Sequence, residues 1–470
     1  MRILSFVADS TDPIPQKPDY VLLATVGALV LLGLVMVYSA SFVEAFLLHR
    51  SQHYYLLRQI IGAVVGGSGL LLTQHLDYRL WRRYSIHFMG FSLFLLVLVL
   101  ILPASFTTVN GSKSWIRLGG GLLSFQPSEI TKLALIIYFA DWLSRRGHKL
   151  GNVTYGLIPF GMMLGLVCGL VMLEPDLGTT VILVTIAGVV YFAAGANLLH
   201  ILGAAGLGIG AFWALINLVG IQNGRIEAFK DPWKYYSSFG YQPIHALYAL
   251  GSGGIFGTGL GQARQKFQWL PQAHTDTIFA IVGEELGLIG ATAVLIGFAL
   301  IAYRGYRIAM RSSDPFAALV AVGITSWLVF QAVINIAVTT SLVPFTGLTL
   351  PFISYGGTSL IMSLVSMGVL LNISRHITLP QLKEQANEAR TSRSPALAFS
   401  QVRERVLANL PLWRWDRRPR LPSLGRRPGV AEPNKRKFWQ HSFSNREPGR
   451  KRLKTKQPRG PQDREHEIRP

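Results

Sequence analysis

The sequence predicts an all-α polytopic membrane protein of about ten transmembrane helices, from its composition and from the grouping of its apolar residues. Half of the residues are hydrophobic and only 15% are charged, whereas a soluble domain carries about 25% charged residues. The mean hydropathy is +0.35, and the apolar residues fall in blocks of the ~20 residues that a helix needs to cross the hydrocarbon core. This pattern excludes an ordinary soluble enzyme.

The first expected span covers about 20–40 and follows a polar N-terminal segment, 1–19. That segment lacks the short charged region of a cleaved signal peptide, and the apolar run after it is too long for one. We therefore expect 1–19 to be an N-terminal tail. Further spans are expected near 58–75, 85–102, 128–144, 155–173, 178–195, 198–220, 277–303, 316–340 and 352–373.

Basic residues in the short loops predict the orientation, because such residues are retained on the cytoplasmic side of a membrane. With the N-terminus inside, the inner loops carry Arg79, Arg82, Arg83, Arg145, Arg146, Lys149, Arg304, Arg307 and Arg311. The short outer loops carry Arg50, Lys113 and Arg117. We therefore expect a ten-span membrane domain over 20–375 with both termini in the cytoplasm.

Two segments lie outside this pattern. The stretch 221–276 is expected to be a large extracytoplasmic loop between the seventh and eighth spans, and such long loops are usually functional. From Ser374 onward the chain carries 24 of its 45 Lys and Arg residues but 9 of its 24 Asp and Glu residues. We expect 376–470 to be a basic, mostly disordered cytoplasmic tail that is held near anionic lipid and binds no nucleic acid.

Several kinds of site are excluded or weakly indicated. The single cysteine, Cys168, rules out an intramolecular disulfide and a cysteine metal cluster. The histidines have no paired metal-ligand spacing. The glycine-rich stretch 251–261 lacks the Gly-Lys-Ser/Thr ending of a phosphate-binding P-loop, so we interpret it as a flexible or re-entrant turn.

The first group of candidate site residues lies just before the eighth span. His274 and Asp276 stand there in sequence, and Glu284 follows two helical turns further along. A carboxylate at a membrane boundary beside an apolar wall can have a raised pKa and act as a general base. The alternative is a helix start, at which Thr275 or Asp276 caps the span.

Two further groups lie on the outer side. Lys113 and Arg117 precede the fourth span, and Glu129 and Lys132 stand in its first turns. These residues form either a cationic rim for a phosphate and a sugar, or, for Glu129 and Lys132, a structural ion pair at positions i and i+3. Asp176 lies in a tight turn between the fifth and sixth spans, where it either caps the sixth span or faces the same cavity.

The fourth group surrounds the entrance of the last span. Prolines and glycines in 344–359, together with Ser354, indicate a non-helical re-entrant segment, which is tolerated only when it is buried in protein or lines a wet cavity. Gln331 and Asn335, four residues apart in the ninth span, either line that cavity or form interhelical hydrogen bonds.

The residues alone therefore predict polar groups gathered on the outer face of a membrane domain. Both chemistry on an amphiphilic substrate and transport of such a substrate fit this pattern, because charges at membrane depth are usually functional.

In these motifs the sequence resembles the SEDS family (shape, elongation, division and sporulation), which includes FtsW, RodA and SpoVE. The resemblance covers about 20–375. It is carried by Val109-Asn-Gly-Ser-Lys-Ser-Trp-Ile116, Phe125-Gln-Pro-Ser-Glu-Ile-Thr-Lys132, Glu174-Pro-Asp-Leu-Gly-Thr179, the glycines of 251–261, Gln265-Lys266, His274-Thr-Asp276, Gly283-Glu-Glu-Leu-Gly287 and Leu350-Pro-Phe-Ile-Ser-Tyr-Gly-Gly357. The sequence is more similar to the FtsW and SpoVE side of the family than to RodA, although Thr277, His245 and Ser341 depart from the usual pattern.

The resemblance implies a peptidoglycan glycosyltransferase in the bacterial cytoplasmic (inner) membrane. Such enzymes polymerise lipid II, an undecaprenyl-pyrophosphate-linked disaccharide peptide, in cell division or elongation. They work with a class B penicillin-binding transpeptidase and, in division, with other divisome membrane proteins. The alternatives are a lipid II flippase and a non-catalytic scaffold that recruits the transpeptidase.

The resemblance also implies roles for individual residues. Asp276 matches the essential aspartate of the family, and its expected role is general base toward the acceptor hydroxyl. Lys113, Arg117, Arg225 and Lys266 are expected to stabilise charge on the pyrophosphate. A divalent cation, Mg²⁺ or Mn²⁺, is plausible beside the pyrophosphate, and no other cofactor is implied.

Overall fold

A computed structural model describes residues 17–109, 112–118, 123–147, 150, 152–197, 199, 200, 203, 206, 208, 210 and 223–376. The chain divides into two units, 1–390 and 391–470, and every described residue belongs to the first. The predicted seventh span, 198–220, lies largely outside the described residues, and the predicted tail, 376–470, lies outside them after His376.

Helices account for nearly all of the described secondary structure. The bounds are α1 Tyr20–Leu47, α2 Tyr54–His75, α3 Tyr78–Arg83, α4 Ser85–Ile101, α5 Ala104–Thr107, α6 Pro127–Ser144, the π-helical turn η3 Val153–Leu157, α7 Ile158–Leu173, α8 Leu177–Ala193, α10 Asn223–Lys230, α11 Tyr241–Gly253, α12 Ile278–Arg311, α13 Pro315–Thr339 and α14 Gly357–Arg375. Four short strands form two antiparallel pairs: β1 Thr108–Val109 with β2 Ser112–Lys113, and β3 Ile116–Leu118 with β4 Leu123–Phe125.

The prediction of an all-helical, multi-pass membrane protein is confirmed. Among the described residues six helical segments are long and apolar enough to cross a membrane: α1, α2, η3 with α7, α12, α13 and α14. The apolar helices α4 and α8 are shorter, and α6 carries Glu129, Lys132 and Asp141 in its 18 residues. Nine of the predicted spans thus coincide with helices, while the total of ten stays a prediction.

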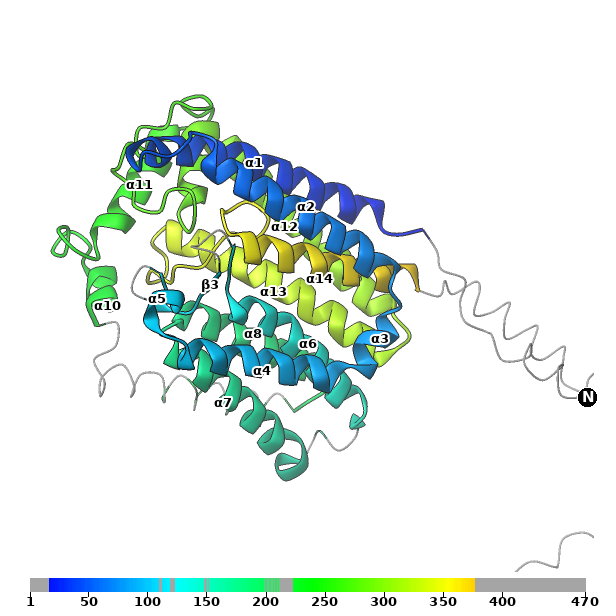
Figure 1. Ribbon diagram of the computed structural model, residues 1–470. Coiled ribbons are helices and arrows are strands. Elements are labelled where there is room, and N and C mark those ends of the chain that lie inside the picture. The colour runs from blue at the N-terminus through cyan, green and yellow to red at the C-terminus, as the bar shows by residue number, and fades with distance from the viewer. Residues whose placement is uncertain are drawn as a thin grey trace, which may run out of the picture. The chain divides into compact units, whose positions relative to one another are not determined.

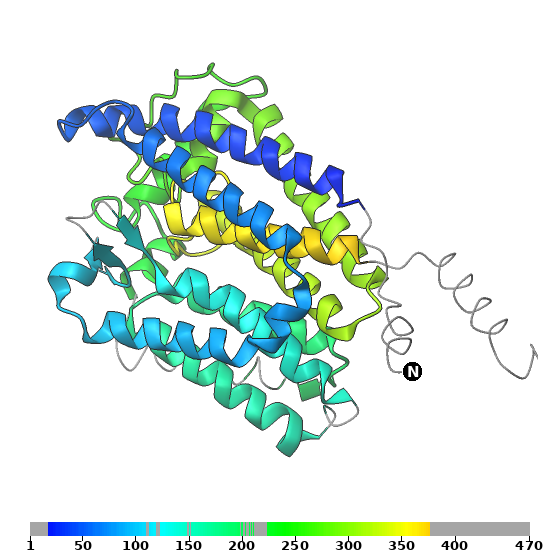
Figure 2. The same ribbon diagram turned by 45° about the vertical axis from the view of Figure 1, so that its right-hand side comes forward.

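The two central helices, α13 and α14, are mostly buried, whereas α1, α2 and α7 leave most of their apolar surface exposed. This difference is expected if lipid covers the outer helices. Helix α14 lies between the α1–α2 pair and the α4–α6 pair in both views (Figures 1 and 2). Glycines permit the closest approach of α2 and α14: a Cβ on Gly66 would clash with α14, and one on Gly368 would clash with α2.

Polar contacts show which chain segments lie together at one end of the helix bundle. The backbone N–H of Asp19, just before α1, donates to Ser374 Oγ near the end of α14 at 3.2 Å, and Asp19 also pairs with Arg304 of α12 at 2.6 Å. The two chain ends of the described unit therefore lie together, at the end that carries most of the loop arginines. This arrangement agrees with the predicted grouping of loops.

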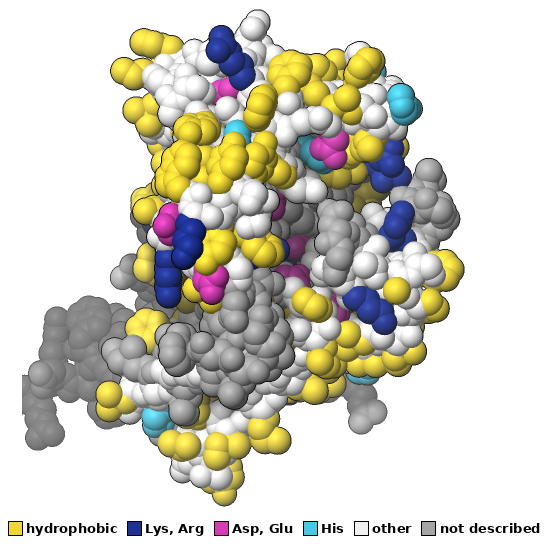
Figure 3. Space-filling view, turned by 90° about the vertical axis from the view of Figure 1, so that its left-hand side faces the viewer, with side chains coloured by type: hydrophobic (Ala, Val, Ile, Leu, Met, Phe, Trp, Pro, Cys, Tyr) yellow, Lys and Arg dark blue, Asp and Glu magenta, His cyan; other side chains and the backbone are white. Residues whose placement is uncertain are grey.

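The opposite end carries the strands, α5, α10, α11 and the residues 340–356 (Figure 1). The predicted loop 221–276 therefore contains two helices where it is described. The predicted non-helical entrance to the last span is also present, because α14 begins only at Gly357. At this end the molecule is hollowed, and acidic side chains lie within the hollow (Figure 3).

Candidate functional site

Asp276 lies in the turn directly before α12, and α13 holds that turn in place. The side-chain amide of Asn335 donates to the backbone carbonyl of Asp276 at 2.8 Å and to that of Leu348 at 2.6 Å. One amide thus joins the Asp276 turn to the segment that leads into α14. Asn335 therefore supports the site by hydrogen bonding across elements.

The Asp276 carboxylate is partly buried beside this segment. Thr275 Oγ1 donates to its Oδ1 at 3.2 Å, and a Cβ built on Gly347 would lie 3.9 Å from its Oδ2. Burial raises the pKa of Asp276 to about 6, while Thr275, His274 and Arg225 act in the opposite direction. A carboxylate with a pKa near 6 is suited to general base catalysis near neutral pH.

The helix-cap alternative for this turn is not what the structure shows. Thr277 is the N-terminal capping residue of α12, and its side chain makes no capping hydrogen bond. Thr277 Oγ1 donates instead to the carbonyls of Pro271 and Gln272, at 3.2 and 3.0 Å. The Asp276 carboxylate is therefore not engaged in capping its own helix.

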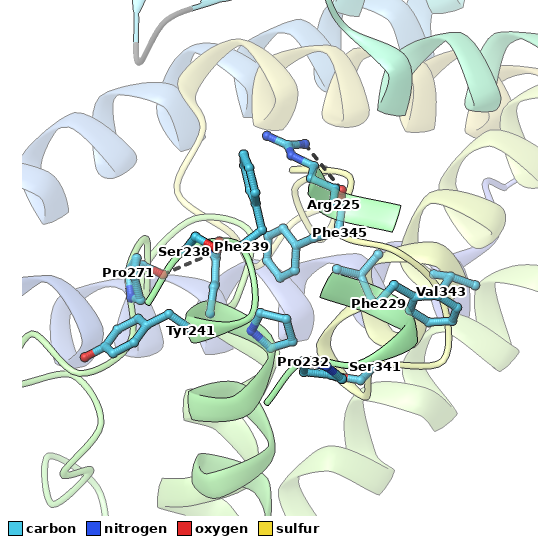
Figure 4. A pocket seen from close by; sticks show the side chains of 13 residues that line it. Arg225, Phe229, Pro232, Ser238, Phe239, Tyr241, Pro271, Ser341, Val343 and Phe345 are labelled. Carbon is cyan, nitrogen blue, oxygen red and sulfur yellow. Dashed lines mark hydrogen bonds between the residues drawn. The ribbon is translucent and has the colours of Figure 1, made fainter. Parts of the chain in front are cut away.

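A pocket of about 240 Å³ reaches Pro271, in the segment that precedes Asp276 (Figure 4). It is lined by Arg225, Phe229, Pro232, Ser238, Phe239, Tyr241, Gln242, Pro243, Pro271, Val338, Ser341, Val343 and Phe345. Arg225 Nη1 donates to the carbonyl of Phe345 at 3.3 Å. Burial lowers the pKa of Arg225, and the negative charge of Asp276 opposes that shift. The pocket thus offers aromatic walls with one cation in its lining, a composition typical of ligand sites, and that cation interacts electrostatically with Asp276.

His274 points away from this pocket, into the bundle. It is buried, its Nδ1 lies 3.1 Å from Glu44 Oε2 of α1, and its ring lies against Tyr55 and Tyr355. Its carbonyl accepts a hydrogen bond from the Tyr355 backbone at 2.9 Å. His274 therefore anchors the Asp276 turn to α1, α2 and the α14 entrance, and its contact with substrate stays a prediction.

Lys266 is also enclosed. Its ammonium lies 2.7 Å from Glu285 Oε1 and 3.2 Å from Ser39 Oγ, and both charged side chains are fully buried. Ser39 Oγ donates to the same carboxylate at 2.6 Å. Because its charge is neutralised inside the bundle, Lys266 does not face the pocket as the predicted phosphate-binding cation.

Glu284 has a structural position. Its carboxylate accepts the backbone N–H of Arg264 at 2.6 Å and of Gln265 at 3.3 Å, and its carbonyl accepts Thr258 N–H at 2.9 Å. These bonds hold the glycine-rich segment against α12. The segment approaches so closely that a Cβ on Gly257 would clash with the Glu285 carbonyl. The segment predicted as a flexible or re-entrant turn therefore packs against α12, and Glu284 is not among the residues that line the pocket.

Glu129 and Lys132 form the structural ion pair that the sequence left open. Their side chains are buried and 2.8 Å apart, Lys132 Nζ also donates to Gln331 Oε1 at 2.9 Å, and it lies 4.8 Å from the centre of the Trp327 ring. Gln331 in turn donates to the Thr349 carbonyl at 2.9 Å. This network supports the residues that precede α14.

Four predicted residues remain: Lys113, Arg117, Asp176 and Ser354. Lys113 Nζ donates to the Leu100 carbonyl at 2.6 Å, while Arg117 is exposed on β3. Asp176 caps α8, accepting Thr179 N–H at 2.9 Å, and also accepts Gln126 Nε2 at 2.9 Å. Ser354 Oγ accepts the Leu350 N–H at 2.8 Å. Thus Arg117 stays a candidate for substrate contact, whereas Asp176 and Ser354 shape the backbone.

Three residues of this region were not singled out from the sequence: Glu44, Tyr55 and Glu174. Glu44 is a carboxylate near the end of an apolar span, a signal that points to a paired or functional group. Glu174 is fully buried, and burial raises its pKa to about 9. No three His, Cys, Asp or Glu side chains lie together in a metal-binding arrangement among the residues the structure describes. The divalent cation therefore stays a prediction.

The comparisons with known proteins agree with the fold. A family model for cell cycle proteins, that of FtsW, RodA and SpoVE, matches 19–379, and the chain belongs to this family. A relative from Trichlorobacter lovleyi, named probable peptidoglycan glycosyltransferase FtsW, is 42% identical over 364 residues, which cover 77% of this chain and 95% of the relative. Stage V sporulation protein E of Bacillus subtilis is 42% identical over 363 residues, covering 77% and 98% of the two chains.

Solved structures with the same fold are also known. The rod shape determining protein RodA of Thermus thermophilus superposes with a TM-score of 0.56 at 29% identity, covering 77% of this chain and 98% of that one. A chain from a peptidoglycan synthase complex, described as coordinating polymerization and crosslinking, superposes with a TM-score of 0.64 at 29% identity, covering 76% and 98%.

Proposed function

We propose that this protein is a peptidoglycan glycosyltransferase that polymerises lipid II at the end of the bundle where Asp276 lies. The observation that carries the proposal is the Asp276 carboxylate, with its raised pKa and its electrostatic interaction with Arg225, a residue that lines an aromatic-walled pocket. The names of the relatives support the reaction class. The similarity to FtsW and SpoVE supports a role in cell division or sporulation.

In the proposed reaction Asp276 takes the proton of the acceptor sugar's 4-hydroxyl group. The oxygen forms a bond to the anomeric carbon of the donor as the bond from that carbon to the pyrophosphate oxygen breaks. The electron pair leaves with undecaprenyl pyrophosphate, and attack from the opposite face converts an α linkage to a β linkage. At pH 7 a group with a pKa of about 6 is roughly nine-tenths ionised, so Asp276 is ready to accept the proton.

The reaction also requires that the negative charge growing on the leaving pyrophosphate be stabilised, and cations at this end of the bundle can do so. Arg225 is at the pocket edge and contacts Phe345. Arg117 is exposed on β3, and β4, which pairs with β3, contacts Thr358 through the carbonyl of Ser124. The two cations thus belong to different elements, of which one reaches the segment leading into α14 and the other reaches the first turn of α14. A divalent cation that is held mainly by pyrophosphate oxygens is compatible with this arrangement.

The membrane and the partner belong to the same proposal. The end that holds Asp19, Arg304 and Ser374 lies on the cytoplasmic side of a bacterial inner membrane, because it carries the arginine-rich loops. Asp276 then faces the outer side, where polymerisation takes place. A class B penicillin-binding transpeptidase crosslinks the product, a role supported by the similar synthase complex, which is described as coordinating polymerization and crosslinking. The basic tail is proposed to rest on anionic lipid.

The test is lipid II polymerisation by the purified protein with its co-purified transpeptidase, comparing wild type with Asp276→Asn. The matched control is Asp231→Asn, an exposed aspartate at the same end of the molecule. We expect glycan strands from wild type and from the control, and none from Asp276→Asn at unchanged thermal stability or higher. Equal strands from all three would remove Asp276 as the base. No strands from any of them, with the partner present, would favour a flippase, which movement of labelled lipid II across vesicles would then show.

A further inference from the structure

A second pocket lies at the opposite end of the described unit, where α1 begins and where α12 and α14 end. Its volume is about 380 Å³. It is lined by Lys17, Pro18, Asp19, Tyr20, Val21, Arg304, Arg307, Ile308, Arg311 and Ser374. None of these residues belongs to the site around Asp276, so the function proposed above gives the pocket no role.

The charge in this pocket is strongly positive. Arg304, Arg307 and Arg311 follow each other at intervals of three and four residues, so they share one face of the last two turns of α12. Lys17 adds a fourth cation from the chain before α1. The lining contains one carboxylate, Asp19, which pairs with Arg304 at 2.6 Å. Within the described lining, Lys17, Arg307 and Arg311 are therefore not paired with a carboxylate of the pocket.

The pocket also lies at the level expected for lipid headgroups. Tyr20 and Tyr303 flank it on α1 and α12, and each is 59% exposed. Exposed tyrosines on membrane helices mark the boundary between hydrocarbon and water. Val21 and Ile308 supply apolar surface within the lining itself. An occupant therefore meets cations and an apolar wall at the same depth.

We propose that this pocket binds the phosphate diester headgroup of an anionic glycerophospholipid. The oxygens of the phosphate would accept hydrogen bonds from Arg307, Arg311 and Lys17, and the acyl chains would lie against Val21 and the neighbouring apolar surface of α1. Basic pockets between membrane helices are known lipid headgroup sites. A soluble phosphate would satisfy the cations but would leave the apolar wall without a partner. This site is separate from the tail beyond His376 and does not depend on the proposed polymerase activity.

The experiment is native mass spectrometry of the purified full-length chain in detergent, titrated with dioleoyl phosphatidylglycerol. Dioleoyl phosphatidylcholine is the neutral probe, and inorganic phosphate at millimolar concentration is the soluble competitor. The test variant is Arg307→Gln combined with Arg311→Gln. The matched control is Arg83→Gln, an exposed arginine of α3 that does not line the pocket. Arg307→Lys keeps the charge and reports whether substitutions in α12 disturb folding. Every variant retains the basic tail.

We expect the double variant to bind the first phosphatidylglycerol about 25-fold more weakly, at about fivefold for each arginine. The Arg83→Gln and Arg307→Lys variants should bind it as wild type does, and phosphatidylcholine should bind weakly to all of them. Unchanged binding by the double variant, or an equal loss in Arg83→Gln, would overturn the proposal in favour of diffuse attraction by the tail. Displacement of the lipid by inorganic phosphate would overturn it in favour of a soluble anion site.

Discussion

The rate of polymerisation should fall steeply between pH 7 and pH 5, because the pKa of Asp276 is about 6. The ionised fraction of such a group is about 0.9 at pH 7, one half at pH 6 and about 0.1 at pH 5. An aspartate at its usual value of 3.8 would still be more than about nine-tenths ionised at pH 5. The structure thus predicts a roughly tenfold loss where an ordinary aspartate predicts almost none.

A neighbouring charge should shift the acid limb of the pH–rate profile, which is the fall in rate below pH 7. Arg225 stabilises the ionised form of Asp276, so Arg225→Gln should raise the pKa of Asp276 and shift the limb to higher pH. Lys230→Gln, an exposed cation on the same helix α10, is the control and should leave the limb in place. Because Arg225 also lines the pocket, the position of the limb and not the absolute rate is the informative quantity.

The assay is the initial rate of lipid II polymerisation at subsaturating substrate over pH 5 to 8, since kcat/KM reports the ionisation of the free enzyme. Recovery of activity after return to pH 7 shows that the protein has not unfolded. A wild-type profile that is flat from pH 7 to pH 5 would refute the assignment of the base. A limb that stays in place in Arg225→Gln would refute the electrostatic link between the two residues.

Three further predictions concern the supports of the site. Lys266→Met should lower the thermal midpoint strongly, since an unpaired buried Glu285 costs about 3–5 kcal/mol. Lys266→Met combined with Glu285→Met should restore most of the lost stability. A double variant as unstable as the single one would contradict the pairing. Asn335→Ala should reduce kcat at least about tenfold while the protein still inserts, because two carbonyls that position Asp276 lose their donor; a wild-type rate would show that the turn holds itself. Asp276→Asn should raise the midpoint at pH 8 and not at about pH 3. The raised pKa means that the folded protein binds the proton more tightly than the unfolded chain. The cost in stability therefore grows between pH 3.8, the usual pKa, and about pH 6, and is fully present above pH 6; an equal gain at both pH values would argue against this.

Much of the fold could be predicted because local amino-acid composition is enough to identify membrane spans. An apolar block of sufficient length has few alternatives to a helix in lipid, where every backbone polar group must be paired internally. The same logic located the non-helical entrance to α14, where glycine and proline interrupt an apolar run. The position of Asp276 as a candidate base was predictable from a carboxylate at a membrane boundary and from its motif. Its raised pKa required the burial that only packing provides.

The direction in which each charged side chain points was not predictable. Lys266 and Glu285 are 19 residues apart and meet Ser39 of α1 inside the bundle. A cation in an outer loop is equally compatible, from sequence, with a buried ion pair and with a phosphate contact. The structure distinguishes the two because the distances and the burial of the partners are visible in it.

The sequence by itself determined that this protein is a helical membrane protein of the FtsW, RodA and SpoVE family, with its polar motifs gathered at one end. These properties depend on composition and on residue order, which are local. Only the tertiary structure decided that Asp276 interacts with Arg225, which lines a pocket, while Glu284, Lys266 and His274 brace the surrounding segments. Those assignments depend on contacts between α1, α12, α13 and the segment before α14. Such contacts arise when the helices pack, so no single stretch of sequence contains them.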